Sequence, residues 1–470
     1  MHLLIVVSVA EAQVVAVSQE VNMQKNMDYD ILGQYGDMIL MAEISDTGVE
    51  IQSFDGNLFT RWKKSLKFDS KKIFINDVVP GDTSFSVVFT EIGDDFIGLK
   101  ISRYDSKADV IDTKLIKAYE KERILPRFKI TPSEDKKWIA IHQMLVESQL
   151  EVLFISRDNS VLVADHLYDV SQFDFRRNFK TIFLSNEAEL FIILDNTMNV
   201  TRHTNQLITV IRSDINSTIP HVIDKQIIQY ALSNIIYIYD NVNRQVVATG
   251  LYSETVRSES LGAFRLSIPH NARKAGEPSF VAYTDQLLTD FLTSSGKRNK
   301  DDVIPNLQVQ DALLRMDGGV VLIAEKRKEY ERSLYQGRRD FYSMRFAIDY
   351  YYEDLILIAI NPDGSNHWQK MLQKKQYSFD DDALYSSFFI FKNPSSVRLL
   401  YNDEIRNENT VSEYIITGGG KHERRSLLAT NRQDLKLQIR NALQVSESEV
   451  IIPSIKRNKL KLVKVDYLST

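Results

Sequence analysis

The stretch EDLILIAINPDGSNHWQKML, Glu353 to Leu372, places an aliphatic run, a tight turn and a tryptophan in that order. Leu355 to Ile360 is a continuous apolar run, which is typical of a strand buried on both faces. Pro362 and Gly364 supply the fixed φ angle and the glycine of a β-turn, so Trp368 falls on a returning strand. The stretch therefore predicts a strand, a tight turn and a second strand.

The same order of features returns elsewhere in the chain. VEIQSFDGNLFTRWKKSL, Val49 to Leu66, has an apolar strand, an Asp-Gly turn and a tryptophan. FKITPSEDKKWIAIHQ, Phe128 to Gln143, places a proline-containing turn before Trp138, and VLFISRDNSVLVADHLY, Val152 to Tyr168, predicts a hairpin around Asp158. Short strands separated by turn signals every ~8–12 residues indicate an all-β sandwich, barrel or propeller.

Larger units recur at about 40 to 60 residues, close to the length of one four-stranded blade. A single sandwich of 470 residues would be oversized. We therefore expect an all-β, β-propeller-like fold of about seven blades, within a range of about six to eight. Trp62 and Trp368 are expected to fill the space between blades rather than to form a carbohydrate platform.

One region departs from the strand pattern. In AYTDQLLTDFLTSSGKRNKDD, Ala282 to Asp302, the apolar residues follow helical spacing, and Thr284 or Asp285 can cap the start. This predicts a helical insertion near residues 282–300. The segment that follows has strand-like ends and a long charged, aromatic middle, so the inserted region extends to about residue 348. The remainder of 13–470 is predicted as a single β-propeller-like domain.

Composition narrows the classes of function. The net charge of −5 and a pI of about 6.0 give no overall positive field, so we expect no nucleic-acid partner. The chain has no cysteine, which excludes disulfides, thiolate catalysis and cysteine-ligated metal sites. Its eight histidines are scattered, and Asp380 to Asp382 lacks the alternating spacing of a calcium loop. No catalytic residue, metal ligand or cofactor is predicted, but carboxylates that pair only in space stay open.

The N-terminal residues bear on the compartment. Leu3 to Ala10 is apolar, and Ala10-Glu11-Ala12 is a small-x-small cleavage pattern. We interpret residues 1–12 as a truncated signal peptide and expect the protein in the periplasm or cell envelope. The alternative is a first β-strand that continues through QVVAVS, Gln13 to Ser18. No later apolar stretch reaches the ~18–20 residues of a membrane helix, so no membrane span is expected.

Cations and aromatic rings alternate within the inserted region. The candidate binding residues are Lys326, Arg327, Arg332, Tyr335, Arg338, Arg339, Phe341 and Tyr342, with Lys328, Tyr330 and Arg345 beside them. Such a patch can bind a polyanion or the acidic face of another protein, and we favour a protein. The alternative is a solvated hairpin whose cations are balanced by Glu325, Glu329 and Glu331.

The C-terminal third resembles a known group of proteins. MDGGVVLIAEKR, which begins at Met316, is followed by DYYYEDLILIAINPDGSNHWQKMLQKKQYSFDDDALYSSFFIF, VRLLYND and EVIIPSIKRNKLKLVKV, which ends at Val465. This series resembles exported Bacteroidota β-propeller-like proteins of unknown function. The resemblance implies an exported propeller without assigned catalysis and transfers no functional residue. FDDDALYSS stands where the group has a glycine-rich form.

Taken together, these patterns predict a non-enzymatic interaction scaffold of the cell envelope, with another envelope protein as its partner. One specific form, which the resemblance alone implies, is an accessory of an outer-membrane export machine. The alternative is a carbohydrate-active propeller, either a glycan-binding module or a glycoside hydrolase with acids in the central channel. A hydrolase predicts carboxylates that converge on one end of the channel, whereas a scaffold predicts an exposed apolar or charged patch.

Overall fold

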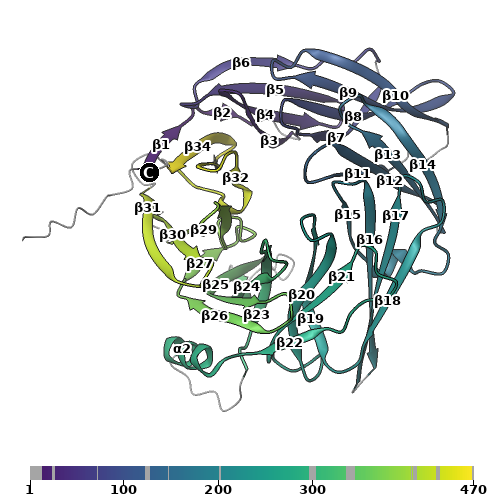
Figure 1. Ribbon diagram of the computed structural model, residues 1–470. Helices are drawn as coiled ribbons and strands as arrows, with labels where there is room; N and C mark the ends of the chain where they lie inside the picture. Colours follow the sequence, from purple (N-terminus) through teal and green to yellow (C-terminus); the bar gives the residue numbers. More distant parts are fainter. Residues whose placement is uncertain are drawn as a thin grey trace, which may run out of the picture.

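The computed structural model describes residues 13–23, 27–70, 72–121, 127–146, 148–200, 203–295, 303–334, 345–403, 405, 410–429 and 435–467. Strands make up 64% of the structure and helices 4%. The strands form eight sheets around a central axis, and Figure 1 looks along that axis. The protein is therefore an all-β propeller with eight blades.

Within a blade, neighbouring strands are antiparallel, and in blades 1 to 7 the first strand in sequence is the innermost. Blade 1 contains β3 (Asp28–Tyr35), β4 (Met38–Ser45), β5 (Gly48–Asp55) and β6 (Thr60–Ser65). Blade 2 contains β7 (Ile73–Val79), β8 (Ser84–Ile92), β9 (Phe96–Asp105) and β10 (Val110–Glu120). Blade 3 contains β11 (Lys129–Pro132), β12 (Trp138–Val146), β13 (Gln149–Ser156) and β14 (Val161–Asp169).

The next blades repeat this order. Blade 4 follows the short helix α1 (Phe175–Asn178) and contains β15 (Phe179–Leu184), β16 (Glu189–Val200), β17 (His203–Asp214) and β18 (His221–Ile227). Blade 5 contains β19 (Ala231–Asp240), β20 (Gln245–Ser253), β21 (Gly262–Pro269) and β22 (Ser279–Ala282). Blade 6 contains β23 (Leu307–Leu314), β24 (Val320–Leu334), β25 (Arg345–Ile360) and β26 (Asn366–Leu372), and β27 (Gln376–Phe379) adds to β25. Blade 7 contains β28 (Phe389–Lys392), β29 (Ser396–Asn402), β30 (Thr410–Thr417) and β31 (His422–Ala429).

Blade 8 joins strands from opposite ends of the described chain. After the 3-10 turn Ile439–Asn441 it contains β32 (Leu443–Gln444), β33 (Glu449–Lys456) and β34 (Lys459–Tyr467). Its outermost strand is β1 (Gln13–Val17), and the short β2 (Val21–Asn22) also pairs with β34. Val14 lies opposite Asp466 and Val17 opposite Val463, so main-chain hydrogen bonds close the ring.

The predicted all-β propeller is confirmed, and eight blades is the upper end of the predicted range. Seven, the centre of that range, is one fewer than the number of blades in the ring. QVVAVS does supply a strand, β1, as one of the two interpretations of this stretch required. Residues 1–12, the predicted signal remnant, lie outside the described residues.

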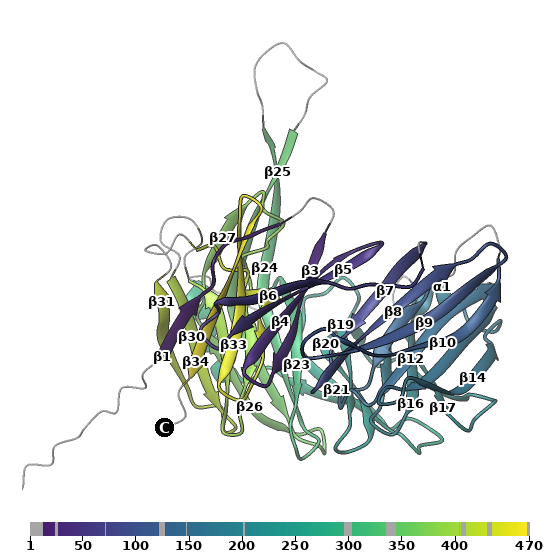
Figure 2. The ribbon, with the colours of Figure 1, turned by 90° about the horizontal axis from the view of Figure 1, so that it is seen from above.

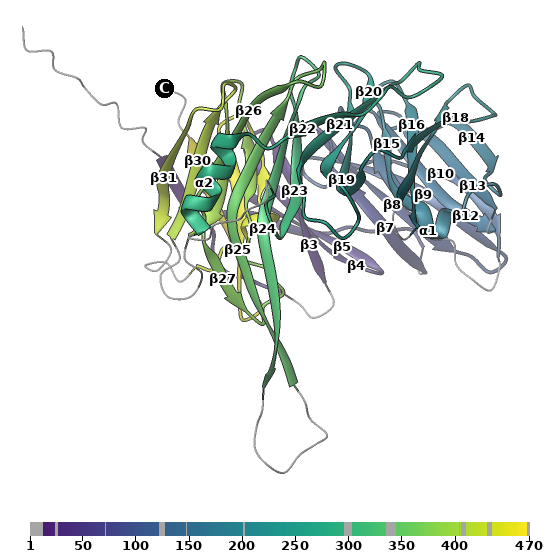
Figure 3. The same cartoon turned by 90° about the horizontal axis from the view of Figure 1, so that it is seen from below.

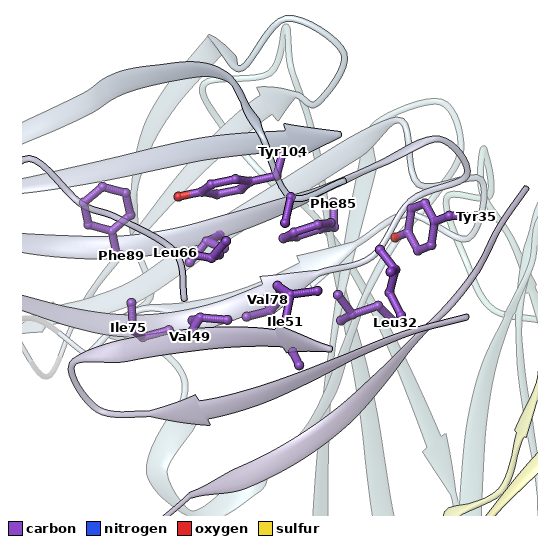
Figure 4. Close-up of a cluster of buried hydrophobic side chains, with 14 of the residues drawn as sticks. Leu32, Tyr35, Val49, Ile51, Leu66, Ile75, Val78, Phe85, Phe89 and Tyr104 are labelled. Carbon is purple, nitrogen blue, oxygen red and sulfur yellow. The ribbon is translucent and has the colours of Figure 1, made fainter. Parts of the chain in front are cut away.

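Apolar side chains from facing sheets fill the space between blades. Figure 4 shows the cluster between blades 1 and 2, in which Leu32 and Ile51 of one blade meet Val78 and Phe85 of the next. Phe85 stacks on Tyr104 with 5.3 Å between ring centroids. Because strands alternate their side chains between two faces, each blade can supply such a cluster on both sides.

The stretch from Glu353 to Leu372 forms the predicted hairpin between β25 and β26. Gly364 has a φ of 85° and donates its N–H to the Asn361 oxygen at 2.9 Å. Arg265 of blade 5 reaches this turn and donates to the Pro362 carbonyl at 3.0 Å and to the Gly318 carbonyl at 2.8 Å. One buried guanidinium therefore ties blade 5 to two turns of blade 6.

The predicted helical insertion is α2 (Asp285–Ser295), after blade 5. Thr284 caps it, since its hydroxyl oxygen accepts the Leu287 N–H at 3.3 Å. Leu287 and Phe291 are buried against the apolar cluster of blades 5 and 6. The helix thus covers the outside of the ring next to blade 6, as Figure 1 shows.

Both tryptophans of the sequence prediction pack against clusters between blades. Trp62 is half-buried against the cluster of blades 1 and 2, and Trp368 against that of blades 6 and 7. The indole N–H of Trp368 donates to the Gly418 carbonyl of blade 7 at 2.9 Å. Trp368 therefore joins two blades, as expected of a framework residue.

Candidate functional site: a hairpin arm on blade 6

The second and third strands of blade 6 form a much longer hairpin than their equivalents in blade 1, since β24 has 15 residues and β25 has 16, whereas β4 and β5 have 8 each. In blade 1 a tight turn between Ser45 and Gly48 connects the two strands. In blade 6, β24 and β25 stay paired from Val320 opposite Ile360 out to Leu334 opposite Arg345. Figures 2 and 3 show that the outer part of this hairpin projects beyond the face of the ring. We call β24 from Arg327 and β25 up to Tyr352 the arm.

A buried ion pair lies where the arm leaves the blade. Lys374 and Glu325 both have side chains with no exposed surface, and 2.5 Å separates the lysine Nζ from the glutamate Oε1. Lys374 also donates to the Tyr352 carbonyl at 3.1 Å and to the Gln376 side-chain oxygen at 2.6 Å. Burial lowers the pKa of Lys374, and attraction to Glu325 opposes that shift. The pair therefore fixes the strands of the hairpin to the segment before β27.

Hydrogen bonds extend this network into blade 7. The Ser387 hydroxyl donates to the second Glu325 oxygen at 2.8 Å, and the Ser387 N–H donates to Gln376 at 2.8 Å. Gln376 donates in turn to the Asn402 carbonyl at 2.6 Å. A buried charge is tolerated only when such partners surround it, so the base of the arm is a rigid junction.

The loop between β27 and β28 supports the same junction in a costly conformation. Asp380, Asp382, Ala383 and Ser387 have φ angles of 51°, 53°, 54° and 70°. This left-handed region favours glycine, and each other residue in it costs roughly 1 kcal/mol. FDDDALYSS thus holds four left-handed residues without a glycine, and buried Ala383 clusters with Tyr350 and Tyr352.

Tyrosines form a row across the two strands of the arm and the adjoining strand β27. Tyr330 of β24 packs edge-on against Tyr351 of β25 at 5.7 Å, and Tyr351 packs against Tyr377 of β27 at 5.0 Å. On the same face, Asp349 accepts from Arg332 Nε at 3.0 Å and from the Tyr377 hydroxyl at 2.5 Å. Tyr330 ends the row and is 54% exposed.

The structure places three of the predicted binding residues in internal contacts. Lys326 forms an ion pair with Glu353 at 2.6 Å, and its ammonium lies 5.5 Å from the Phe291 ring. Arg327 pairs with Glu329 through Nε at 2.9 Å, as the charge balance of the sequence suggested, and Arg332 pairs with Asp349.

The remaining predicted binding residues are Tyr335, Arg338, Arg339, Phe341 and Tyr342, and all five lie outside the described residues. The basic, aromatic patch as a whole therefore stays a prediction. Lys374, Gln376 and Ser387 were not predicted, because nothing in their local sequence distinguishes them from surface residues.

Three aspartates, Asp30, Asp77 and Asp311, lie on innermost strands, which is where the carbohydrate-active alternative places its acids. Burial raises the pKa of Asp77 to about 6, and Asp30 of the neighbouring innermost strand adds to the rise by repulsion. Burial also raises the pKa values of Asp30 and Asp311. Asp30 lines a cavity of about 460 Å³ together with Tyr29 and Gln438.

Two of these aspartates make the same local contact in different blades. Asp77 and Asp311 each follow an irregularity in the innermost strand, and each accepts the N–H of the next residue, Val78 at 2.8 Å and Ala312 at 2.7 Å. Because this contact repeats at the same place in two blades, the folding of the innermost strand explains it without a catalytic role. Among the described residues, no group of three or more His, Cys, Asp or Glu side chains could hold a metal ion.

No protein-family model matches the chain, and a search of curated proteins finds no match. Solved structures with a similar fold include the β-propeller domain of the Trilobed protease from Pyrococcus furiosus, at 10% identity and a TM-score of 0.37 over 86% of this chain and 98% of that one. The Nup133 β-propeller domain from Vanderwaltozyma polyspora is 11% identical, with a TM-score of 0.37 over 83% of this chain and 99% of that one. Prolyl oligopeptidase B from Galerina marginata is 8% identical, with a TM-score of 0.40 over 93% of this chain and 55% of that one. The assignment of the fold rests on the eight-bladed ring itself.

In the part of the chain that the structure describes, no helix is both long enough and apolar enough to span a membrane.

Proposed function

We propose that the protein is a non-enzymatic interaction scaffold that presents the arm to another protein. The observation that carries this proposal is the projection of the arm beyond the ring, above a fully buried ionic junction. Tyr330 and Phe346, both on the arm, are 54% and 53% exposed. Exposed aromatic side chains on a rigid support are common anchors of protein interfaces.

The alternative, a glycoside hydrolase, has weaker support. It needs two carboxylates of different protonation state on either side of a sugar. Asp77 has a suitably raised pKa, but its carboxylate already accepts a main-chain N–H, as Asp311 does in blade 6. Framework roles account for both residues, so we place recognition on the arm.

Export to the periplasm or cell envelope, with an accessory role in an outer-membrane export machine, is part of the proposal. It rests on the apolar residues before Ala12 and on the resemblance of the C-terminal third. Fractionation of cells that express the tagged protein from its native upstream region would test it. Tagged protein in the cytosolic fraction alone would contradict export.

A pull-down after mild crosslinking, with a shortened arm as the comparison, tests the scaffold. Replacing 329–350 by Asn-Gly removes the outer arm and joins Lys328 to Tyr351, which lie directly opposite each other in the hairpin. The matched control changes two exposed apolar residues away from the arm, Met316→Ser and Ile219→Ser. We expect a stoichiometric partner that the shortened arm fails to retain and the control retains. A partner that the shortened arm retains equally would contradict the proposal.

A further inference from the structure

One edge of the arm has no strand beside it among the described residues. Within blade 6, β23 covers β24 only as far as Lys326, which lies opposite Leu307. The chain before β23 turns away at Asn306, whose φ is 56°, and Ile304 pairs with Ser260 of blade 5 instead. From Arg327 outward, β24 is therefore paired on one side only, with β25.

The direction of the main-chain groups along this edge follows from one hydrogen bond. Arg327 donates its N–H to the Asn306 carbonyl at 2.9 Å, so its main-chain groups point away from β25. Because successive residues of a strand point their N–H and C=O groups to opposite edges, those of Glu329, Glu331 and Ser333 also point to the open edge. The edge lies on the channel side of the sheet, where β23 is the innermost strand.

The side chains beside this edge differ between the two faces of the arm. Tyr330 ends the tyrosine row on one face, and one side of its ring has no aromatic neighbour among the described residues. Glu329 and Glu331 lie on the other face, where both are exposed, and Arg327 beside them pairs with Glu329 and leaves Glu331 as the outer negative charge. A strand added here would continue the tyrosine row on one face and meet negative charge on the other.

We propose that this edge accepts an extended segment of a partner protein as an antiparallel strand. The segment places an aromatic side chain beside Tyr330 and basic or neutral polar side chains opposite Glu329 and Glu331. Main-chain hydrogen bonds supply affinity in such strand addition, and alternate side chains supply specificity. This inference rests on the proposed function, because it names how the arm holds its partner.

Charge favours a different protein over a second copy of this chain. Self-pairing centred on Tyr330 would set Glu329 opposite Glu331 and Lys328 opposite Arg332. The register that pairs Glu329, Glu331 and Ser333 with one another would set Glu331 opposite Glu331. Like charges directly opposite each other destabilise a sheet, so these registers are disfavoured.

A displayed library of random peptides, selected on the full-length protein, is the probe. Glu331→Pro removes an N–H that points to the open edge and leaves the pairing with β25 intact, whereas Glu331→Ala keeps that N–H. We expect selected peptides that alternate basic and aromatic residues. In fluorescence anisotropy they should bind Glu331→Pro at least about tenfold more weakly than wild type, and Glu331→Ala within about threefold. N-methylation at alternate peptide positions should also cost at least about tenfold, and the melting temperatures of both variants should match wild type.

No enrichment in the selection, or equal binding to wild type and Glu331→Pro, would overturn the inference. The scaffold proposal is tested separately from the strand addition. If the crosslinked partner is lost with the shortened arm but retained by Glu331→Pro, the arm recognises its partner through other groups, and only the strand addition is wrong.

Discussion

The two ends of the β24–β25 hairpin use charge in opposite ways. At the base, Glu325 and Lys374 form an ion pair with no exposed surface, and neighbouring side chains hold both. On the arm, Arg332 pairs with Asp349, and here the aspartate is buried but the arginine side chain is 56% exposed. Loss of one partner destabilises a fully buried pair strongly, whereas a pair with one partner in solvent contributes less. The difference indicates that the base fixes the direction of the arm and the outer part is available for contact.

The largest effect is expected from breaking the buried pair. Lys374→Met leaves the Glu325 carboxylate buried without its cation and should lower the free energy of unfolding by about 3–5 kcal/mol. Urea unfolding followed by tyrosine and tryptophan fluorescence would measure it. Lys375→Met, at the exposed neighbouring position, is the matched control and should cost less than about 0.5 kcal/mol.

A double variant sharpens the same test. Lys374→Met with Glu325→Gln removes both charges, so it should recover a large part of the stability lost by Lys374→Met alone. If Lys374→Met and Glu325→Gln, each made alone, lower the free energy of unfolding by less than about 1 kcal/mol, the junction is not the rigid base described above.

The second-largest effect expected is a change of stability with pH, caused by Asp354 at the base of the arm. Burial raises the pKa of Asp354, which accepts the Lys374 N–H at 3.3 Å and the Ser294 hydroxyl at 3.2 Å. Since the folded state disfavours the charged form, this residue costs stability as pH rises from about 4 through its folded pKa. Asp354→Asn should therefore stabilise the protein more at about pH 7 than at about pH 4.

Thermal unfolding across that pH range would measure the difference between Asp354→Asn and wild type. Glu331→Gln, on the exposed arm, is the control, and its effect should stay below about 0.5 kcal/mol at each pH. An Asp354→Asn effect that is constant with pH would contradict the prediction.

A smaller effect is expected from the half-exposed pair of the arm. Arg332→Ala should lower the free energy of unfolding by less than Lys374→Met does, because the arginine side chain is largely in solvent and the buried Asp349 keeps its hydrogen bond from Tyr377. Lys328→Ala is the comparison on the same face of β24, and we expect no measurable change. A loss of several kcal/mol for Arg332→Ala would remove the contrast between the two ends of the hairpin.

The smallest effect on stability belongs to Tyr330→Ser. More than half of this side chain is exposed, and its edge-on contact with Tyr351 is the contribution that would be lost, about 0.5 kcal/mol. Retention of the crosslinked partner should fall sharply all the same. A marked fall in melting temperature would instead assign Tyr330 to the framework.

The sequence was informative where local chemistry decides structure. The Pro362–Gly364 turn, the hairpin around Asp158 and the helix capped by Thr284 were all predicted, because a few adjacent residues determine each. The junction of Glu325 with Lys374 was not predicted, since the two residues meet only through the folding of the blade. Glu325 had been expected to balance the cations of the hairpin, and it instead pairs with a lysine beyond β26.

The closure of blade 8 by β1 and β34 has a consequence for how the protein folds. Val17 pairs with Val463, so strands from both ends of the described chain must be present before the ring can close. Until they pair, β1 is an unpaired segment and the apolar faces of the terminal blades are uncovered. Pairing across nearly the whole chain is also the slowest kind of contact to form. The open ring should therefore be the state most prone to aggregation, whether the chain folds during synthesis or after export.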